Sequence, residues 1–194
     1  MIKSLPRLIG CTGKQCAGKD EFFKIWKSII SKHINEIFIH NFKFTDPLLE
    51  MQHQIYEIAG LASEEPERDR KLLQFLGTDW GRAKDPDIWV KTLKQRIDNC
   101  RTPNGDIAGY IVVTNVRFDN EADMIKKMDG TIVKIVASDE LQKRRSELMA
   151  VDFIENHVSE AGIDNSKVDH VIVNDLDLVE FARNIRTTFG IEGG

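Results

Sequence analysis

A glycine- and lysine-rich turn near the amino terminus carries the clearest chemical signal in the sequence. Residues 13–19 match the spacing G-x-x-x-x-G-K. Glycines at this spacing let backbone N–H groups converge on phosphate oxygens, and the final lysine reaches the β- and γ-phosphates of a nucleotide. The motif predicts a phosphate-binding loop. The residues expected to contact the nucleotide are Gly13, Lys14, Cys16, Ala17, Gly18, Lys19, Asp20 and Glu21.

The residue after the motif's lysine departs from the usual pattern. Phosphate-binding loops of this type normally continue with Ser or Thr, whose hydroxyl binds Mg²⁺. This sequence has Asp20 instead. A carboxylate can bind Mg²⁺ directly or through water, and it can also cap the N-terminus of a helix. Asp20 is therefore the candidate metal ligand, with helix capping as the open alternative.

The elements that must position this loop follow from hydrophobic periodicity. An apolar run over residues 5–11 is typical of a strand, and residues 19–32 place their apolar side chains on one helical face. A strand before the loop and a helix after it form the context that the motif requires. A chance glycine turn, the alternative interpretation, does not explain that context.

Strands and helices alternate along the rest of the chain. We expect further strands over residues 37–42, 110–116, 131–136 and 168–173, and helices over 47–59, 67–76, 88–97, 120–128 and 176–187. Residues 77–86 are expected to form an irregular link. This alternation predicts an α/β fold of three layers, with a doubly wound, mostly parallel sheet and the functional site at the carboxyl ends of its strands.

Composition excludes several classes of function. The 194 residues fit a single domain, and no apolar run approaches the roughly 20 residues that span a bilayer, so we expect no membrane role. The net charge of −4 argues against a surface that coats nucleic acid. Three cysteines without metal-ligand spacing suit reduced thiols, and no secretion signal is recognisable at the N-terminus. These features favour a cytoplasmic protein.

Several short motifs together resemble a known family, the P-loop deoxynucleoside monophosphate kinases of tailed bacteriophages. The resemblance covers nearly the whole chain, and its motifs occur in the family's order. They are Gly18-Lys19-Asp20, Phe44-Thr45-Asp46-Pro47, Leu76-Gly77-Thr78-Asp79-Trp80-Gly81-Arg82, Asp87-Ile88-Trp89-Val90, Val116-Arg117-Phe118 with Asn120-Glu121-Ala122, and His157 with Ser159-Glu160.

The resemblance implies transfer of the γ-phosphoryl group of ATP, with Mg²⁺, to a deoxynucleoside monophosphate. It also implies a P-loop kinase core over residues 1–45, 107–138 and 161–194, a helical acceptor-binding insert over 46–106 and a lid over 139–160. The family further suggests a homodimer, located in the host cytoplasm if the gene belongs to a phage. The accepted base is not implied.

This activity requires cations at a second phosphate, and arginine forks bind phosphate oxygens in bidentate fashion. Arg82 and Arg117 are the candidates for binding the acceptor phosphate and for catalysis together with Lys19. Surface ion pairing is the alternative for both arginines. Arg144, within the basic run 143–145, is the candidate lid arginine, and a solvated basic helix face is its alternative.

The remaining candidates have equally ordinary structural alternatives. Trp80 and Trp89 are expected to stack on the acceptor base or pack against its sugar, or else belong to the core. Asp46 is expected at the acceptor or at metal-bound water, or else as a helix cap. Asn174, after the last strand, resembles in position a loop that borders adenine, with contacts mainly through backbone. Glu121 is expected to pair locally or cap its helix.

Two rival functions remain at this stage. One is another small-molecule kinase of the same fold, such as an enzyme that acts on dephospho-coenzyme A. The other is a nucleotide-binding module without turnover, suggested by the missing Ser or Thr after Lys19. The tryptophans around Arg82 favour a nucleotide acceptor over the first rival, and the second set of arginines argues against the second.

Overall fold

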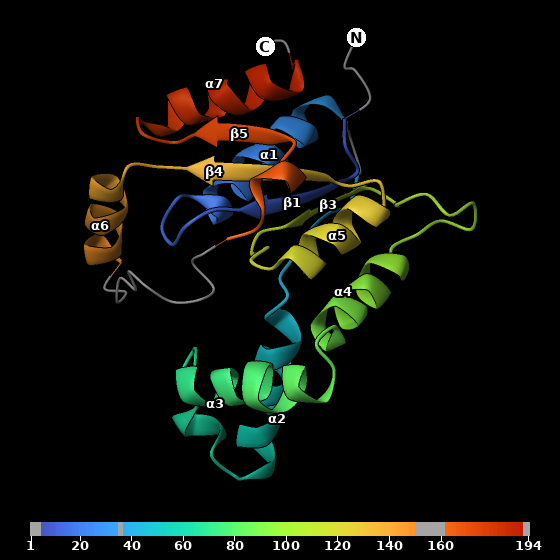
Figure 1. Cartoon of the computed structure of the whole chain (residues 1–194), viewed down its shortest axis with the longest axis vertical. Helices are drawn as coiled ribbons and strands as arrows, with labels where there is room; N and C mark the ends of the chain where they lie inside the picture. Colours follow the sequence, from blue (N-terminus) through green and yellow to red (C-terminus); the bar gives the residue numbers. More distant parts are fainter. Residues whose placement is uncertain (1–4, 35–36, 150–161, 192–194) are drawn as a thin grey trace.

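A five-stranded sheet forms the centre of the molecule (Figure 1). The computed structural model describes residues 5–34, 37–149 and 162–191. The strand order is β2-β3-β1-β4-β5, and all four pairings are parallel. The predicted parallel α/β fold is therefore confirmed. The strands are β1 (Leu8–Thr12), β2 (Ile39–Phe42), β3 (Tyr110–Val113), β4 (Thr131–Val136) and β5 (His170–Val173).

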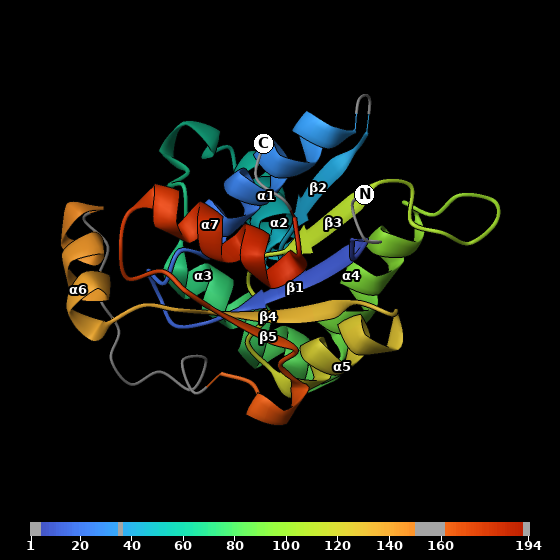
Figure 2. The ribbon, with the colours of Figure 1, turned by 90° about the horizontal axis from the view of Figure 1, so that it is seen from above.

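Helices cover both faces of the sheet, with α1 and α7 on one face and α4 and α5 on the other (Figures 1 and 2). Figure 1 shows α2 and α3 set apart from the sheet, and α6 beyond the ends of β4 and β5. The α-helices are α1 (Lys19–His33), α2 (Asp46–Ile58), α3 (Arg70–Gln74), α4 (Ile88–Asp98), α5 (Asp119–Lys127), α6 (Asp139–Leu148) and α7 (Leu178–Phe189). In the described part of the chain, the other helical segments are the 3₁₀ turns η1 (Ala62–Glu64) and η4 (Asn165–Lys167) and the π-helix η2 (Phe75–Arg82).

Strand β1 is buried on both faces because it is the middle strand of five. Its side chains alternate between two apolar cores: Leu8 packs with residues of α4 and α5, whereas Ile9 and Cys11 pack with residues of α1 and α7. Burying a side chain of the size of Leu or Ile contributes roughly 1.5–3 kcal/mol. The loop that follows β1 is therefore attached to a central strand that is buried on both faces.

The expectation of an irregular link over residues 77–86 is wrong, because η2 continues α3 as a π-helix to Arg82. Two glycines allow this. The Trp89 ring packs against Gly81, where an added Cβ would lie 2.4 Å from Trp89 Cζ2, and the indole N–H donates to the carbonyl of Gly77 at 2.8 Å. The glycines and the proline in this segment indicated a loop, but the segment is helical up to Arg82, where it packs against the buried Trp89.

Strand β3 ends at Val113, before the predicted end at Val116. The backbone turns at Thr114 and Asn115, and the Val116 N–H donates to the Cys11 carbonyl at the end of β1 at 3.0 Å. This turn leaves two polar side chains at the carboxyl edge of the sheet. Among the described residues, no helix is long and apolar enough to cross a membrane.

Candidate active site

The phosphate-binding loop joins β1 to α1, as the motif predicts, and its backbone requires glycine at both ends. Gly13 has φ 139°, and an added Cβ would lie 2.3 Å from the Ile135 carbonyl oxygen. Gly18 has φ 106°, and an added Cβ would lie 2.2 Å from Asn174 Nδ2. Any other residue would therefore meet both backbone strain and a collision at these positions.

The amino end of α1 makes this loop suited to anions. Gly18 is the N-cap residue and makes no side-chain cap hydrogen bond, and the positive end of the helix dipole at this terminus favours a bound anion. The Lys19 ammonium donates to the carbonyls of Gly13 and Lys14 at 2.7 Å each. Lys19 thus lies across the loop that it is predicted to serve.

Asp20 does not occupy the N-cap position, because Gly18 does. Its Oδ1 atom forms an ion pair with Lys43 Nζ at 2.7 Å. The Thr114 hydroxyl lies 3.4 Å from the same oxygen and 3.0 Å from Asn41 Oδ1. The capping alternative is therefore not what the structure shows. Asp20 belongs instead to a group of polar side chains at the carboxyl ends of β2 and β3.

An arginine of α6 also contacts the loop: it is Arg145, the neighbour of the predicted Arg144. Its guanidinium lies 3.3 and 3.5 Å from the carbonyl oxygens of Cys16 and Ala17, and 3.3 and 3.2 Å from the carbonyl and side-chain oxygens of Asn174. A one-residue shift on a helix turns a side chain by about 100°, which a charged run cannot resolve. Of the predicted lid, α6 is described, whereas residues 150–161, with His157, Ser159 and Glu160, lie outside the described residues.

Asn174 supports the loop with its side chain, although we expected backbone contacts near adenine. It is buried, and its amide Nδ2 donates to the Ala17 carbonyl at 2.8 Å. Lys14 adds a second link to α6 through Asp139 at 2.8 Å. The loop is consequently held by β5 and α6 as well as by its own turn.

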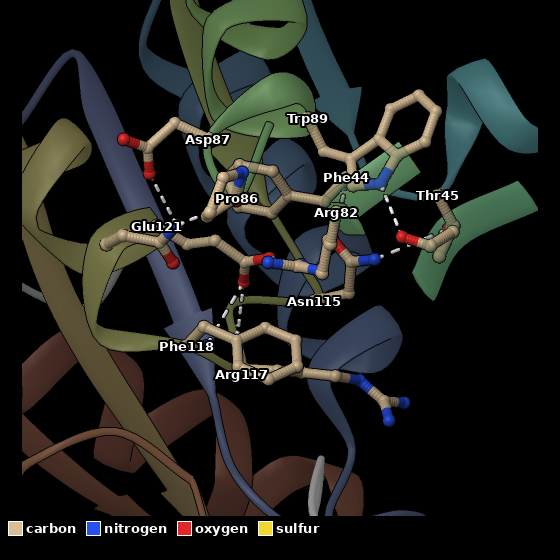
Figure 3. A network of polar contacts seen from close by, with 12 residues as sticks. Phe44, Thr45, Arg82, Pro86, Asp87, Trp89, Asn115, Arg117, Phe118 and Glu121 are labelled. Atoms are coloured by element: carbon tan, nitrogen blue, oxygen red, sulfur yellow. Dashed lines mark hydrogen bonds and ion pairs between the residues drawn. The ribbon is translucent and has the colours of Figure 1, made fainter. Parts of the chain in front are cut away.

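Arg82 lies at the end of η2 and is held by a buried carboxylate (Figure 3). Arg82 NH2 donates to Glu121 Oε1 at 3.0 Å, and the guanidinium carbon lies 4.1 Å from the centre of the Phe118 ring. The Glu121 side chain is only 2% exposed. Burial raises the pKa of Glu121, and this effect exceeds the opposing effects of the Arg117 N–H, the Arg82 charge and the Phe118 N–H.

Arg117 is joined to the same carboxylate through its backbone. Its N–H donates to Glu121 Oε2 at 2.8 Å, and the N–H of Phe118 donates to the same oxygen at 3.2 Å. The expectation that Glu121 caps its helix is confirmed by these bonds at the start of α5. The guanidinium of Arg117 points away from Glu121 (Figure 3).

The other predicted acceptor residues are not all brought together. Trp89 is buried in the core and packs against η2, in line with its structural alternative. Trp80, on η2, is 39% exposed and keeps a face toward solvent. Asp46 starts α2 behind the N-cap residue Thr45, and its carboxylate accepts the backbone N–H of Lys43 at 2.7 Å. Burial raises the pKa of Asp46.

The sequence interpretation did not identify two polar residues at the carboxyl edge of the sheet. Lys43 and Asn115 are polar residues that follow strands β2 and β3, and that position alone could have identified both. Asn115 Oδ1 accepts the Phe44 N–H at 2.8 Å, and its amide lies 3.3 Å from the Thr45 hydroxyl. The pairing of Glu121 with Arg82, 39 residues away, has no signal in the sequence.

Comparison with known proteins shows the family and the fold. Residues 9–185 match the model of a family described as deoxynucleotide monophosphate kinase. A candidate deoxynucleotide monophosphate kinase of Acanthamoeba polyphaga mimivirus is 25% identical, and the similarity covers 92% of this chain and 93% of the mimivirus protein.

Two solved kinases share the fold. The gluconokinase of Sinorhizobium meliloti has a TM-score of 0.56 at 13% identity, covering 97% of this chain and 94% of that one. The APS kinase of Mycobacterium tuberculosis, solved in complex with AMPPNP and APS, has a TM-score of 0.53 at 11% identity, covering 97% and 99%. The family match spans most of the chain, and the chain therefore belongs to the deoxynucleotide monophosphate kinase family.

Proposed function

We propose that this protein transfers the γ-phosphoryl group of ATP to the 5′-phosphate of a deoxynucleoside monophosphate, giving ADP and a deoxynucleoside diphosphate. One observation carries the proposal beyond the family match. Glu121, at the start of α5, joins Arg82 of η2 to the Arg117 backbone, at the same carboxyl edge where β1 delivers the phosphate-binding loop. This arrangement supports a loop for the donor phosphates and a pair of arginines for the acceptor phosphate at one edge of the sheet.

The chemistry needs charge compensation more than proton transfer. The second pKa of a phosphate monoester is near 6, so at neutral pH an acceptor oxygen is already anionic and attacks without a general base. The difficulty is to bring two anions into line. Lys19 serves the donor phosphates, and the guanidinium groups of Arg82 and Arg117 serve the acceptor phosphate and the transferring group.

The donor set beside the loop suits a magnesium ion. Mg²⁺ takes oxygen ligands and is usually held by one or two carboxylates together with substrate phosphates and water. The Asp20 carboxylate, the Thr114 hydroxyl and the Asn41 side-chain oxygen gather beside the loop. Asp20 would hold the ion, with Thr114 and Asn41 able to hold its water shell. When bound, Mg²⁺ neutralises charge on the β- and γ-phosphates.

The helical segment 46–106 is proposed as the acceptor side, and residues 139–160 as the lid. Trp80 is the exposed aromatic residue of η2 that lies nearer to Arg82 in the sequence, two residues before it, whereas the exposed Phe75 begins the helix. We propose that its ring packs against the acceptor sugar or base and disfavours a ribose 2′-hydroxyl. A hydrophobic wall that merely fails to bond an added hydroxyl discriminates by about a hundredfold at best.

A panel of acceptors tests the proposed function. ADP formation from Mg·ATP would be measured with each common deoxynucleoside and ribonucleoside 5′-monophosphate, and with dephospho-coenzyme A. We expect turnover with at least one deoxynucleotide, at a higher kcat/KM than with its ribose counterpart. Turnover with dephospho-coenzyme A alone, or ATP binding without turnover on any acceptor, would contradict the proposal. Equal kcat/KM for a deoxynucleotide and its ribonucleotide would remove only the role of Trp80.

A further inference from the structure

Lys43 stands at the junction between the two proposed phosphate sites, and neither the loop motif nor the family motifs assign it a role. It follows β2 directly, and its backbone N–H is fixed by the Asp46 carboxylate at 2.7 Å. Its ammonium reaches back to Asp20, the residue next to Lys19, at 2.7 Å. Lys43 therefore has an anchored backbone on the acceptor side and a cation beside the donor loop.

The ion pair that holds this ammonium contributes little to stability. The Asp20 side chain is 66% exposed, and exposed ion pairs typically contribute less than about 1 kcal/mol. The Lys43 side chain is 25% exposed, so it gives up more of its contact with water than its partner does. A partly buried cation that is paired with a solvated carboxylate can exchange that partner for a more highly charged anion.

We propose that Lys43 is a catalytic residue that binds the phosphoryl group being transferred, and that Asp20 holds its ammonium in place while the site is empty. The inference rests on the proposed function. A terminal phosphate carries more negative charge and more acceptor oxygens than one carboxylate, so it competes for the ammonium successfully. Lys43 then supplies positive charge from the end of β2, beside the first turn of α1.

A double-mutant cycle separates this role from simple neutralisation of Asp20. ATP and ADP affinities would be measured by calorimetry in EDTA, without metal, for wild type, Lys43→Met, Asp20→Asn and the double variant. If Lys43 binds the terminal phosphate, Lys43→Met lowers ATP affinity by about tenfold or more even in the Asp20→Asn background. ADP affinity in that background changes less than about twofold, because ADP lacks the γ-phosphate that Lys43 is proposed to bind.

Two other outcomes overturn the inference. If Lys43 only neutralises Asp20, Lys43→Met weakens ATP binding in wild type but has no effect once Asp20 is Asn. Equal losses for ATP and ADP would place Lys43 on a phosphate that is not transferred. Lys24 is an exposed lysine of α1 whose Nζ forms an ion pair with Glu21 Oε2 at 3.0 Å. Lys24→Met is therefore the matched control and should change neither affinity.

The design also distinguishes failure of this inference from failure of the proposed function. A wild-type protein that binds no ATP, either with Mg²⁺ or in EDTA, would overturn both. ATP binding that is lost in Lys19→Ala but insensitive to Lys43→Met in both backgrounds would leave the function standing and remove Lys43. Thermal melts of all variants identify any loss of affinity that comes from unfolding, and Lys43→Arg, which keeps the charge, should restore most of the ATP affinity.

Discussion

The two proposed phosphate sites are built in different ways. The proposed donor loop is shaped by backbone: glycines at Gly13 and Gly18 fix its turn, and it joins the fully buried strand β1 to the long helix α1. The acceptor side is shaped by side chains. Arg82 takes its position from one carboxylate, Glu121, and from a π-helix packed on Trp89.

This difference separates two kinds of sensitivity to mutation. A backbone site depends on the few residues whose conformation or charge cannot be replaced, and it tolerates changes elsewhere in the loop. A side-chain site depends on every member of its network, because removing one member of a buried pair leaves the other uncompensated. Substitutions should therefore affect donor and acceptor kinetics separately, and five predictions test that separation.

The largest effect is expected for Lys19→Ala. Removing the cation nearest the donor phosphates should lower kcat by about three orders of magnitude or more, because charge that develops in the transition state loses its compensation. Single-turnover kinetics at saturating ATP measure this directly. A folded variant with near-normal turnover would show that the loop does not take part in catalysis.

Arg82→Ala and Arg117→Ala should weaken binding of the acceptor rather than of ATP. Each should raise the acceptor KM by about ten- to a hundredfold, corresponding to the loss of a charged hydrogen bond, and leave the ATP KM nearly unchanged. Steady-state kinetics with each substrate varied in turn give both constants. A loss confined to ATP would move these arginines to the donor side.

Gly81→Ala should destabilise the acceptor side without touching the donor loop. The new methyl group meets the Trp89 ring and the Leu76 carbonyl, at 2.4 and 2.7 Å from the ideal Cβ position. Overpacking of this kind costs about 1–3 kcal/mol. Urea denaturation measures the loss. Gly105→Ala is the control for steric crowding: no neighbour lies within 4 Å of the added Cβ, so any cost there comes from backbone strain at φ 88° alone.

The helix caps offer a smaller, matched pair of changes. Asp69 caps α3 by accepting the Leu72 N–H at 3.0 Å, and Asp177 caps α7 by accepting the N–H groups of Val179 and Glu180 at 2.9 Å. Replacing either with Ala should cost about 1 kcal/mol. Hydrogen exchange should show faster opening in α2 and α3 for Asp69→Ala, and in β5 and α7 for Asp177→Ala. Faster opening in both regions for either variant would contradict their separation.

The smallest expected effect is a pH slope. The pKa of Glu121 is higher in the folded protein than in the unfolded chain, so ionisation of this carboxyl opposes folding. The stability that the protonated carboxyl contributes is fully present below the ordinary carboxyl pKa and is lost as pH rises through the folded pKa. Wild type should therefore lose stability relative to Glu121→Gln as pH rises across that window, by less than the limit of about 1.4 kcal/mol per pH unit for one proton. Urea melts between pH 4 and 8 measure this slope, and parallel curves would contradict it.

The donor side could be predicted from the sequence because its signals are local. A strand, a glycine motif and a helix occupy one continuous segment, and Lys19 lies where the motif places it. The acceptor side depends on contacts between distant segments. The Arg82–Glu121 pair joins residues 39 positions apart, and the π-helix forms because Trp89 packs onto Gly81. Neither relation has a periodicity that could be read from the chain.

The tryptophans differ in exposure between the two cores and η2, and this difference provides an intrinsic fluorescence reporter. The sequence has three tryptophans: Trp26 and Trp89 are buried in the two cores, whereas Trp80 is 39% exposed on η2. A collisional quencher such as acrylamide therefore reaches Trp80 first, and the quenchable part of the emission comes mainly from a ring two residues from Arg82. An acceptor that covers this ring shields it from the quencher, so occupancy can be followed in the unlabelled protein.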